Sequence, residues 1–428
     1  MSARPPALTA ASPAGARAAT LVNDPTHALA VALCRIDTAR DLDPDRLAPL
    51  AEATFREPFF ALLQRHAVLG LAARTLMRPP LASALSGDTA DELRRTLGRL
   101  RRRAAFWVIE RDRVLGVLRR TGIDPVVVKG GGLCTTLYAE PVEREFGDLD
   151  LLVPEDHLDP AVTALLGAGY ENPWNAAQLE GYRAHHFHLR LTHPRGFVVE
   201  VHFGLTAPHA AFRLDAAEFL AQSVVHDAGR GERLRLPRPE HQLLHVVDQN
   251  ALDAFNHLAK LVDLDRLIRA HPRLRWDLVE AAARRGGLER VLALSLHLTR
   301  ALLGAPIPAA VLHRLDPGPV TRFHLEILRP IPSLLGQRFI ARPVAARLLS
   351  GWMMPRRRDR WRYLALGADD PLHWIWAGHE RPPEGGVTTR ARVLPLAKVL
   401  VYLAGLYLTG LAASVTQRGR AELRFWPS

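Results

Sequence analysis

Residues 126–153 read VVVKGGGLCTTLYAEPVEREFGDLDLLV. The apolar, β-branched run Val126–Val128 predicts a strand that stops at a lysine and three glycines, and LCTTLY after the glycines predicts a helix. A second apolar run, Leu149–Val153, predicts a strand whose start carries Asp-Leu-Asp. Both interruptions put polar chemistry where a buried strand would otherwise continue, so we treat them as the candidate functional site.

The first interruption is typical of a phosphate-binding turn. Glycines ahead of a helix let a ligand approach backbone N–H groups, and the N-terminus of a helix attracts anions. Lys129 would add a positive charge for the same anion. It is one of only three lysines in the chain, so a generally basic composition does not explain it. The order differs from that of a P-loop, in which the lysine follows the glycines, and a plain strand-to-helix connection remains the alternative.

The second interruption predicts a metal site. Asp148 and Asp150 lie two residues apart, so the alternation of a strand points both carboxylates to one face and Leu149 and Leu151 into the core. Two like charges held this close repel each other unless a cation lies between them. Mg²⁺, which binds a few carboxylates together with phosphate oxygens, fits this role. Solvated acids at a strand edge are the alternative.

A third acid occurs in VVEVHF, where Glu200 interrupts another apolar strand. A carboxylate there is unfavourable if it is buried without a partner. If this strand lies beside the Asp-Leu-Asp strand, three carboxylates would surround one or two metal ions, which is the arrangement for in-line displacement at phosphorus. His202 is then expected to orient Glu200.

Hydrophobic spacing divides the chain into five segments. Apolar residues recur every three to four positions on both sides of the strand-like runs, which predicts amphipathic helices, whereas the middle of the chain is α/β. The predicted strands are 126–128, 149–153, 186–191 and 197–203. The predicted segments are a disordered leader (1–24), an N-terminal helical region (25–122), a mixed core (123–210), a helical domain (211–310) and a basic, aromatic and apolar extension (311–428).

The runs KGGGL, LYAEPVEREFGDLDLLV, LGAGY and VVEVHF resemble a bacterial family of the polymerase-β-like nucleotidyltransferase superfamily. The shared pattern is a Lys-Gly after a strand, then a Tyr, an Arg and Asp-x-Asp. The likeness covers roughly residues 25–305. It implies an α/β (α+β) nucleotidyltransferase core with a mixed sheet, flanked by N-terminal and C-terminal helical units.

The resemblance also implies an activity, namely transfer of a nucleoside monophosphate from an NTP to a hydroxyl acceptor with release of pyrophosphate. It implies Mg²⁺, as two ions, with Mn²⁺ as an alternative. Glu200 would both bind metal and accept the proton of the acceptor. The implied metal ligands are Asp148, Asp150 and Glu200, and the implied triphosphate contacts are Lys129, Gly130, Gly131 and Arg144.

Several functional alternatives stay open. Asp-x-Asp also binds nucleotide sugars in glycosyltransferases, although those enzymes usually carry a longer nucleotide-binding region ahead of the motif. A catalytically silent nucleotide-binding or accessory protein on the same fold is the second alternative, and phosphoryl transfer is a third. The acceptor is equally open among a small molecule, a peptide, a protein side chain and RNA.

Charge and composition bear on partners and location. The formal net charge of +12 favours a polyanionic partner, although a codon bias toward Arg gives the same charge. Two widely spaced cysteines suit a reducing cytoplasm. Residues 353–415 combine RRRDRWRYL with the uncharged run Val399–Val415, which favours a peripheral membrane contact.

Two polar groups have competing interpretations. HHFHLRLTH, from His185 to His193, contains His186 and His188 on one strand face, but its spacing matches no closed zinc pattern, so half-buried strand histidines are favoured over a metal site. In LVDLDRLI, a helix with one solvated face is favoured over a cleft lined by Asp263 or Asp265 with Lys260.

Overall fold

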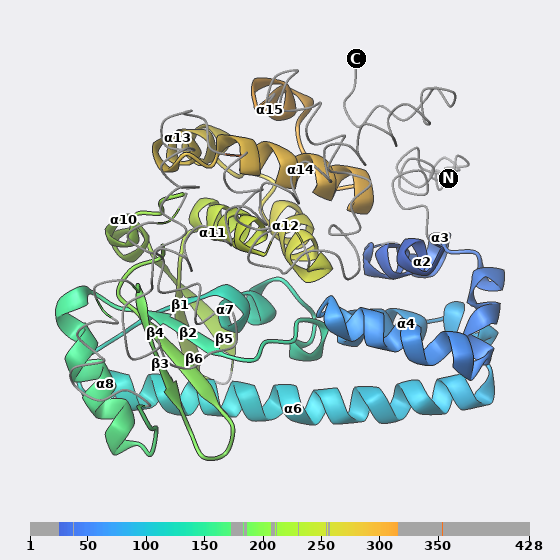
Figure 1. The fold of residues 1–428 in the computed structure, drawn as a ribbon, viewed down its shortest axis with the longest axis horizontal. Coiled ribbons are helices and arrows are strands. Elements are labelled where there is room, and N and C mark those ends of the chain that lie inside the picture. Colours follow the sequence, from blue (N-terminus) through green and yellow to red (C-terminus); the bar gives the residue numbers. More distant parts are fainter. Residues whose placement is uncertain are drawn as a thin grey trace, which may run out of the picture.

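The computed structural model describes residues 25–36, 38–172, 183, 186–206, 210, 212–229, 231–253, 255, 257–315 and 353. This part of the chain is an α+β fold, in which a six-stranded mixed sheet lies between a long helix and a layer of shorter helices (Figure 1). The expected α+β core with a mixed sheet and helices on both sides is confirmed.

The N-terminal region is helical. Its elements are α2 (Pro25–Cys34), α3 (Thr38–Asp41), η1 (Pro44–Ala51), α4 (Ala53–Arg65), α5 (Leu69–Leu76), η2 (Leu81–Ala84) and α6 (Gly87–Arg120). The long helix α6 begins at Gly87, because the Ser86 hydroxyl accepts a hydrogen bond from the Thr89 amide and caps the helix. It ends before Gly122, whose φ of 83° turns the chain toward the first strand.

The sheet has the strand order β3-β4-β2-β1-β6-β5. Its strands are β1 (Val126–Val128), β2 (Leu149–Leu152), β3 (His188–Thr192), β4 (Val198–His202), β5 (Val224–Gly229) and β6 (Glu232–Leu236). Strands β2 and β4 run parallel, whereas β1 pairs with β2, and β3 with β4, in antiparallel fashion. The four predicted strands are therefore present and adjacent to one another.

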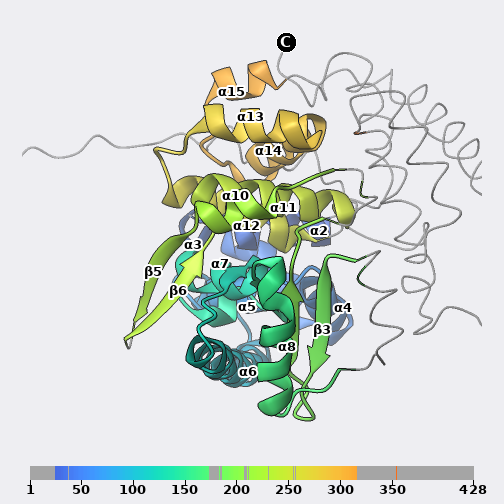
Figure 2. The ribbon, with the colours of Figure 1, turned by 90° about the vertical axis from the view of Figure 1, so that its left-hand side faces the viewer.

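The hairpin of β5 and β6 was missed, because residues 211–310 were expected to be helical. Strand β6 joins the sheet parallel to β1 and buries Leu234 and Leu236, whereas most of β5 is exposed and carries few apolar residues on an inner face. Figure 2 shows this hairpin at one side of the molecule and β3 toward the other. A short edge strand of this kind lacks the alternation on which strand prediction depends.

The two faces of the sheet differ in chemistry. One face places Leu149, Leu151, Val199 and Val201 in a core with α6 and α8 (Leu158–Gly167). The other face carries Asp150, Glu200 and His202, while Val126, Val128 and Leu152 pack there with Phe219 of α10 (Ala216–Ala221). The predicted burial of Leu149 and Leu151 opposite the aspartate is confirmed.

The layer above the sheet is the predicted second helical unit. It consists of α11 (Pro239–Leu252), α12 (Leu258–Ala270), α13 (Trp276–Gly286), α14 (Glu289–Leu303) and α15 (Ala309–Arg314). These helices share one hydrophobic core with α2, α4 and α5. The expected solvated face of LVDLDRLI is wrong: Asp263 is 1% exposed and Asp265 is fully buried, because α12 is packed on several sides.

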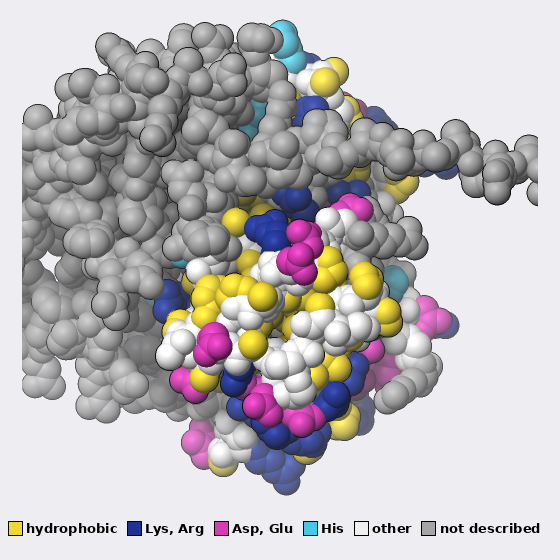
Figure 3. All heavy atoms as spheres, turned by 90° about the vertical axis from the view of Figure 1, so that its right-hand side faces the viewer, with side chains coloured by type: hydrophobic (Ala, Val, Ile, Leu, Met, Phe, Trp, Pro, Cys, Tyr) yellow, Lys and Arg dark blue, Asp and Glu magenta, His cyan; other side chains and the backbone are white. Residues whose placement is uncertain are grey.

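The surface of the described part carries mixed charge. Figure 3 shows apolar side chains in the middle of one end, with Lys and Arg beside Asp and Glu along its lower rim. None of the helices in the described ranges is both long enough and apolar enough to cross a bilayer. Residues 353–415, where a membrane contact was expected, lie outside the described residues except for Met353, as does the leader 1–24.

Candidate metal and nucleotide site

The sheet brings the three predicted carboxylates together. Asp150 on β2 is directly opposite Glu200 on the parallel strand β4, and Asp148 immediately precedes β2. One carboxylate oxygen from each of the three side chains lies within 4.8 Å of the other two. The group is therefore compact enough to hold a metal ion, and we call Asp148, Asp150 and Glu200 the carboxylate cluster.

The electrostatics of the carboxylate cluster favour a bound cation. Burial, followed by the negative charges of Asp150 and Glu200, raises the pKa of Asp148 to about 6. Asp150 is only 1% exposed, so water does little to separate these charges. Glu200 differs, because His202, His188 and Lys129 outweigh its burial and lower its pKa. A divalent ion with oxygen ligands fits this donor set.

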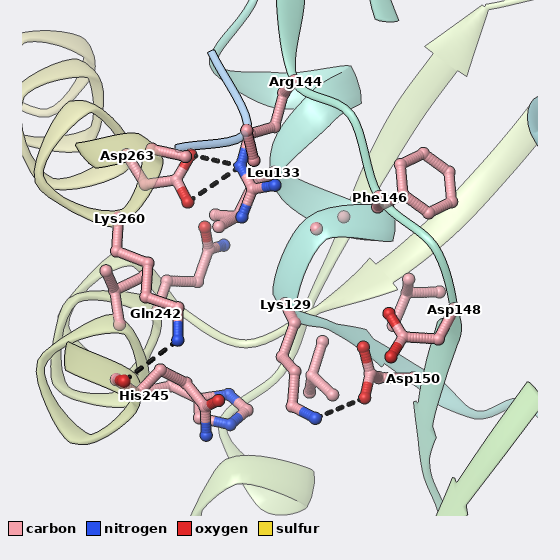
Figure 4. A pocket seen from close by; sticks show the side chains of 18 of the residues that line it. Lys129, Leu133, Arg144, Phe146, Asp148, Asp150, Gln242, His245, Lys260 and Asp263 are labelled. Atoms are coloured by element: carbon pink, nitrogen blue, oxygen red, sulfur yellow. Dashed lines mark hydrogen bonds and ion pairs between the residues drawn. The ribbon is translucent and has the colours of Figure 1, made fainter. Parts of the chain in front are cut away.

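Lys129 supplies the positive charge nearest to the cluster. Its ammonium donates to Oδ1 of Asp150 at 2.5 Å (Figure 4). It also lies 3.5 Å from Oε2 of Glu200. Burial alone would lower the pKa of Lys129, but these two carboxylates outweigh it and raise that pKa. Lys129 also has a φ of 53°, an uncommon value for a residue with a side chain. The lysine therefore lies over the acids at the point where the strand becomes a helix.

A cavity of about 360 Å³ opens beside the cluster, between the start of α7 (Lys129–Thr136) and helices α11 and α12. Five of the residues implied by the resemblance line it, namely Lys129, Gly130, Arg144, Asp148 and Asp150. Gly131 and Glu200 are not among the lining residues within the described part of the chain. Glu200 instead approaches the cluster from β4, on the sheet side.

The glycines of α7 have a packing role that the sequence did not reveal. A Cβ on Gly130 would lie 2.8 Å from Cβ of Phe146, and one on Gly132 would lie 2.9 Å from Cδ2 of Leu236. A Cβ on Gly131 would lie 3.0 Å from Cδ1 of Leu149. The three glycines thus let α7 lie directly on the sheet.

Arg144 is held at the cavity by a buried ion pair. Its Nε donates to both carboxylate oxygens of Asp263 at 2.8 and 2.9 Å, and the hydroxyl of Tyr138 donates to the same carboxylate at 2.6 Å. Burial would lower the pKa of Arg144, but Asp263 outweighs it and raises that pKa. The pair ties the loop before β2 to α12. Asp263 is the main site residue whose position was predicted wrongly.

The helical wall of the cavity adds a third cation, Lys260. Lys260 donates to Asp253 and, at 3.0 Å, to the backbone carbonyl of Gln249. Gln242 and His245 line the same wall (Figure 4). Burial lowers the pKa of Lys260. The cavity therefore has Asp148 and Asp150 on its strand side, Asp253 and Asp263 on its helical side, and cations on both sides.

Two histidines lie against the acids. Nε2 of His202 is 3.0 Å from Oδ1 of Asp150 and 3.5 Å from Oε2 of Glu200, so it is closer to Asp150 than to the predicted partner. Nε2 of His188 is 3.7 Å from Oε1 of Glu200, and burial lowers the pKa of His188 to about 3. His186 is buried, and His185 lies outside the described residues.

Comparison with known proteins shows the family of the chain. Residues 56–304 match a family described as uncharacterised nucleotidyltransferases. No curated protein is similar enough in sequence to count as a match. Among solved structures, an antigenic nucleotidyltransferase-like protein from Paracoccidioides brasiliensis is 18% identical, over 48% of this chain and 96% of its own, with a TM-score of 0.30. Because the family match spans more than half of the sequence, the chain belongs to this family of uncharacterised nucleotidyltransferases.

Proposed function

We propose that this protein transfers a nucleoside monophosphate from an NTP to a hydroxyl acceptor and releases pyrophosphate. The observation that carries the proposal is the convergence of Asp148, Asp150 and Glu200 at one edge of a cavity that also contains Lys129 and Arg144. Carboxylates beside cations are what a metal-bound triphosphate requires, because the acids hold the metal and the cations hold the phosphates.

The three carboxylates would hold Mg²⁺, as one or two ions, with Mn²⁺ as an alternative. The bound metal would neutralise charge on the phosphates and orient the attacking and leaving oxygens. Their convergence and the raised pKa of Asp148 support this fit. Glu200 suits the role of ligand better than that of proton acceptor, because the neighbouring His202, His188 and Lys129 lower its pKa.

The phosphates of the NTP would lie between the two sides of the cavity. Lys129 and Arg144 are proposed to contact them from the strand side, with the backbone of Gly130 close by. Lys260 faces the same space from α12 and adds a third positive charge. Catalysis of phosphoryl chemistry depends mainly on positioning the reactants and on stabilising the negative charge of the transition state. Cations fixed at these positions would contribute to both.

The acceptor is proposed to carry a hydroxyl group, on a small molecule, a peptide, a protein side chain or RNA. We propose a cytoplasmic location, with a peripheral membrane contact through residues 353–415, most of which lie outside the described residues. Partition of the purified chain onto anionic vesicles, compared with a chain ending at residue 315, tests that contact. Equal partition of both chains contradicts it.

The catalytic proposal is tested with NTPs labelled at the α or the γ phosphate, in the presence of Mg²⁺ or EDTA and a cell extract as acceptor source. We expect α label in a product, only with metal, and its loss in the Asp148→Asn, Asp150→Asn double variant. Asp156→Asn, at an exposed position of η4 (Glu155–His157), is the matched control and should retain activity. Transfer of γ label alone would identify a kinase, and binding of NTP without any transfer would identify a silent binding protein.

A further inference from the structure

A second set of potential metal ligands lies beside the carboxylate cluster and shares one residue with it. His188 on β3 is directly opposite His202 on β4, and Glu200 precedes His202 by two residues on the same face of β4. One donor atom from each of these three side chains lies within 4.8 Å of the other two. The pairing register of β3 and β4 therefore gathers two imidazoles and a carboxylate.

The separations fit shared coordination better than direct hydrogen bonding. Nε2 of His202 and Nε2 of His188 lie 3.5 and 3.7 Å from the two oxygens of Glu200. Charge-assisted N–H···O bonds are shorter, at about 2.7–2.9 Å. By contrast, two ligands of one tetrahedral ion with bonds of about 2.1 Å lie roughly 3.4 Å apart. Only small movements would then bring the three donors onto one ion.

The ligand types select a class of metal. Imidazole nitrogen suits Zn²⁺, Fe²⁺, Ni²⁺ and Cu²⁺, whereas Mg²⁺ prefers an all-oxygen environment. The side chains of His188 and Glu200 are 17% and 15% exposed, so the group is accessible from solvent although His202 is fully buried. Because two of its three ligands are imidazoles, such a site would bind Mg²⁺ more weakly than a transition-metal ion.

We propose that His188, Glu200 and His202 bind a divalent transition-metal ion such as Zn²⁺, next to the ion held by the carboxylate cluster and sharing Glu200 with it. The inference goes beyond nucleotidyl transfer and concerns metal binding alone, so it stands whether or not the chain transfers nucleotides. Glu200 becomes the bridge between a position rich in oxygen and one rich in nitrogen.

One contact competes with this coordination. Nε2 of His202 lies 3.0 Å from Oδ1 of Asp150, at the distance of a hydrogen bond. If that nitrogen carries a proton it donates to Asp150, and if it carries a lone pair it ligates a metal. This hydrogen bond joins His202 and Asp150, so a variant at His188, on the neighbouring strand β3, tests the metal site while both partners of the bond stay in place.

The test is a titration of the metal-free, full-length chain with Co²⁺, followed by visible absorption, with Zn²⁺ added afterwards as a competitor. We expect Co²⁺ to bind, Zn²⁺ to displace it and excess Mg²⁺ to leave it in place. His188→Gln should weaken Co²⁺ binding by at least about tenfold, because loss of even an outer partner of a metal ligand weakens binding roughly 10- to 100-fold.

Two further variants make the result specific. Asp148→Asn removes a carboxylate that is not one of the three proposed ligands but lies beside Glu200, so it should weaken Co²⁺ binding less than His188→Gln does. His226→Gln, on β5 at the opposite edge of the sheet, is the matched control. Circular dichroism checks that each variant folds, and His188 is preferred to the buried His202 for that reason. Failure of Co²⁺ to bind, equal binding by His188→Gln and the native chain, or an equal loss in Asp148→Asn would overturn the proposal.

Discussion

The ammonium group of Lys129 lies 2.5 Å from Oδ1 of Asp150, at the junction of β1 and α7. The same ammonium lies 3.5 Å from Oε2 of Glu200. Lys129 therefore neutralises negative charge on Asp150 and Glu200, the carboxylates that would otherwise attract a metal ion. A divalent ion and this ammonium therefore compete for the same oxygens. Binding of a metal-bound NTP would resolve the competition, since the triphosphate offers Lys129 another anion.

This competition predicts how Lys129 controls metal affinity. Without nucleotide, Lys129→Met should bind Mn²⁺ more tightly than the native chain, by roughly 3- to 10-fold, or about 0.7–1.4 kcal/mol. The same variant should bind NTP more weakly, because a phosphate contact is lost. Free Mn²⁺ measured by electron paramagnetic resonance reports the first effect. Lys260→Met is the control, because Lys260 pairs with Asp253 and not with the cluster. An unchanged or weaker Mn²⁺ affinity in Lys129→Met would contradict the competition.

The acid cluster could be predicted because strand alternation is a local rule. Glu200 interrupts an apolar run in the same way as Asp150, and two such strands placed side by side must bring their outward carboxylates together. The pattern alone did not require β2 and β4 to be neighbours. That expectation came from the family resemblance, and the parallel register of Asp150 and Glu200 confirms it.

The rest of the site depends on contacts between distant segments. The sequence predicted that Asp263 lies on a solvated helix face. In the structure it is buried, and its ion pair with Arg144, which is distant in the sequence, offsets the cost of burying the carboxylate. The sequence predicted that the glycines of α7 form a phosphate-binding turn. In the structure the side chains of Phe146, Leu149 and Leu236 pack against these glycines. Such effects follow from tertiary packing, which overrides local propensity and periodicity.

Breaking the buried pair of Arg144 and Asp263 should destabilise the fold strongly. Asp263→Ala leaves the guanidinium of Arg144 buried without its carboxylate, and the loss of one partner from such a pair typically destabilises by about 3–5 kcal/mol. Urea unfolding followed by tryptophan fluorescence measures the change. The Arg144→Met, Asp263→Leu double variant should lose less than Asp263→Ala, because no buried charge is left unpaired.

The control for that experiment is the exposed pair of Arg275 and Asp277, whose side chains are 62% and 59% exposed. Asp277→Ala should change the free energy of unfolding little, since water screens this pair. Comparable losses in Asp263→Ala and Asp277→Ala would show that burial does not make the difference.

Replacement of Gly132 tests the close packing of α7. In Gly132→Ala the new Cβ would meet Cδ2 of Leu236 at 2.9 Å and the carbonyl oxygen of Val127 at 3.1 Å. Overpacking of this kind typically destabilises by about 1–3 kcal/mol, which exceeds the gain of up to about 1 kcal/mol from better helix propensity. We expect a lower melting temperature. Gly147→Ala, where a Cβ meets nothing within 4 Å, should melt like the native chain. An equal melting temperature for Gly132→Ala would mean that α7 shifts freely away from the sheet.

Asp248 on α11 predicts a pH dependence of stability. Burial, opposed by Lys260 and then Lys129, raises the pKa of this carboxyl to about 7 in the folded chain, and one of its oxygens has no hydrogen-bond partner. The raised pKa means that the folded state prefers the protonated acid. The protonated Asp248 therefore contributes fully to the stability of the fold below its ordinary pKa near 3.8, and this contribution is lost as the pH rises to about 7.

Asp248→Asn should remove this loss. The free energy of unfolding of the variant, relative to that of the native chain, should therefore increase between pH 5 and pH 8 by on the order of 3 kcal/mol. Urea unfolding at both pH values measures the difference, with the exposed Asp156→Asn as control. A constant difference between Asp248→Asn and the native chain across this range would show that Asp248 does not titrate there.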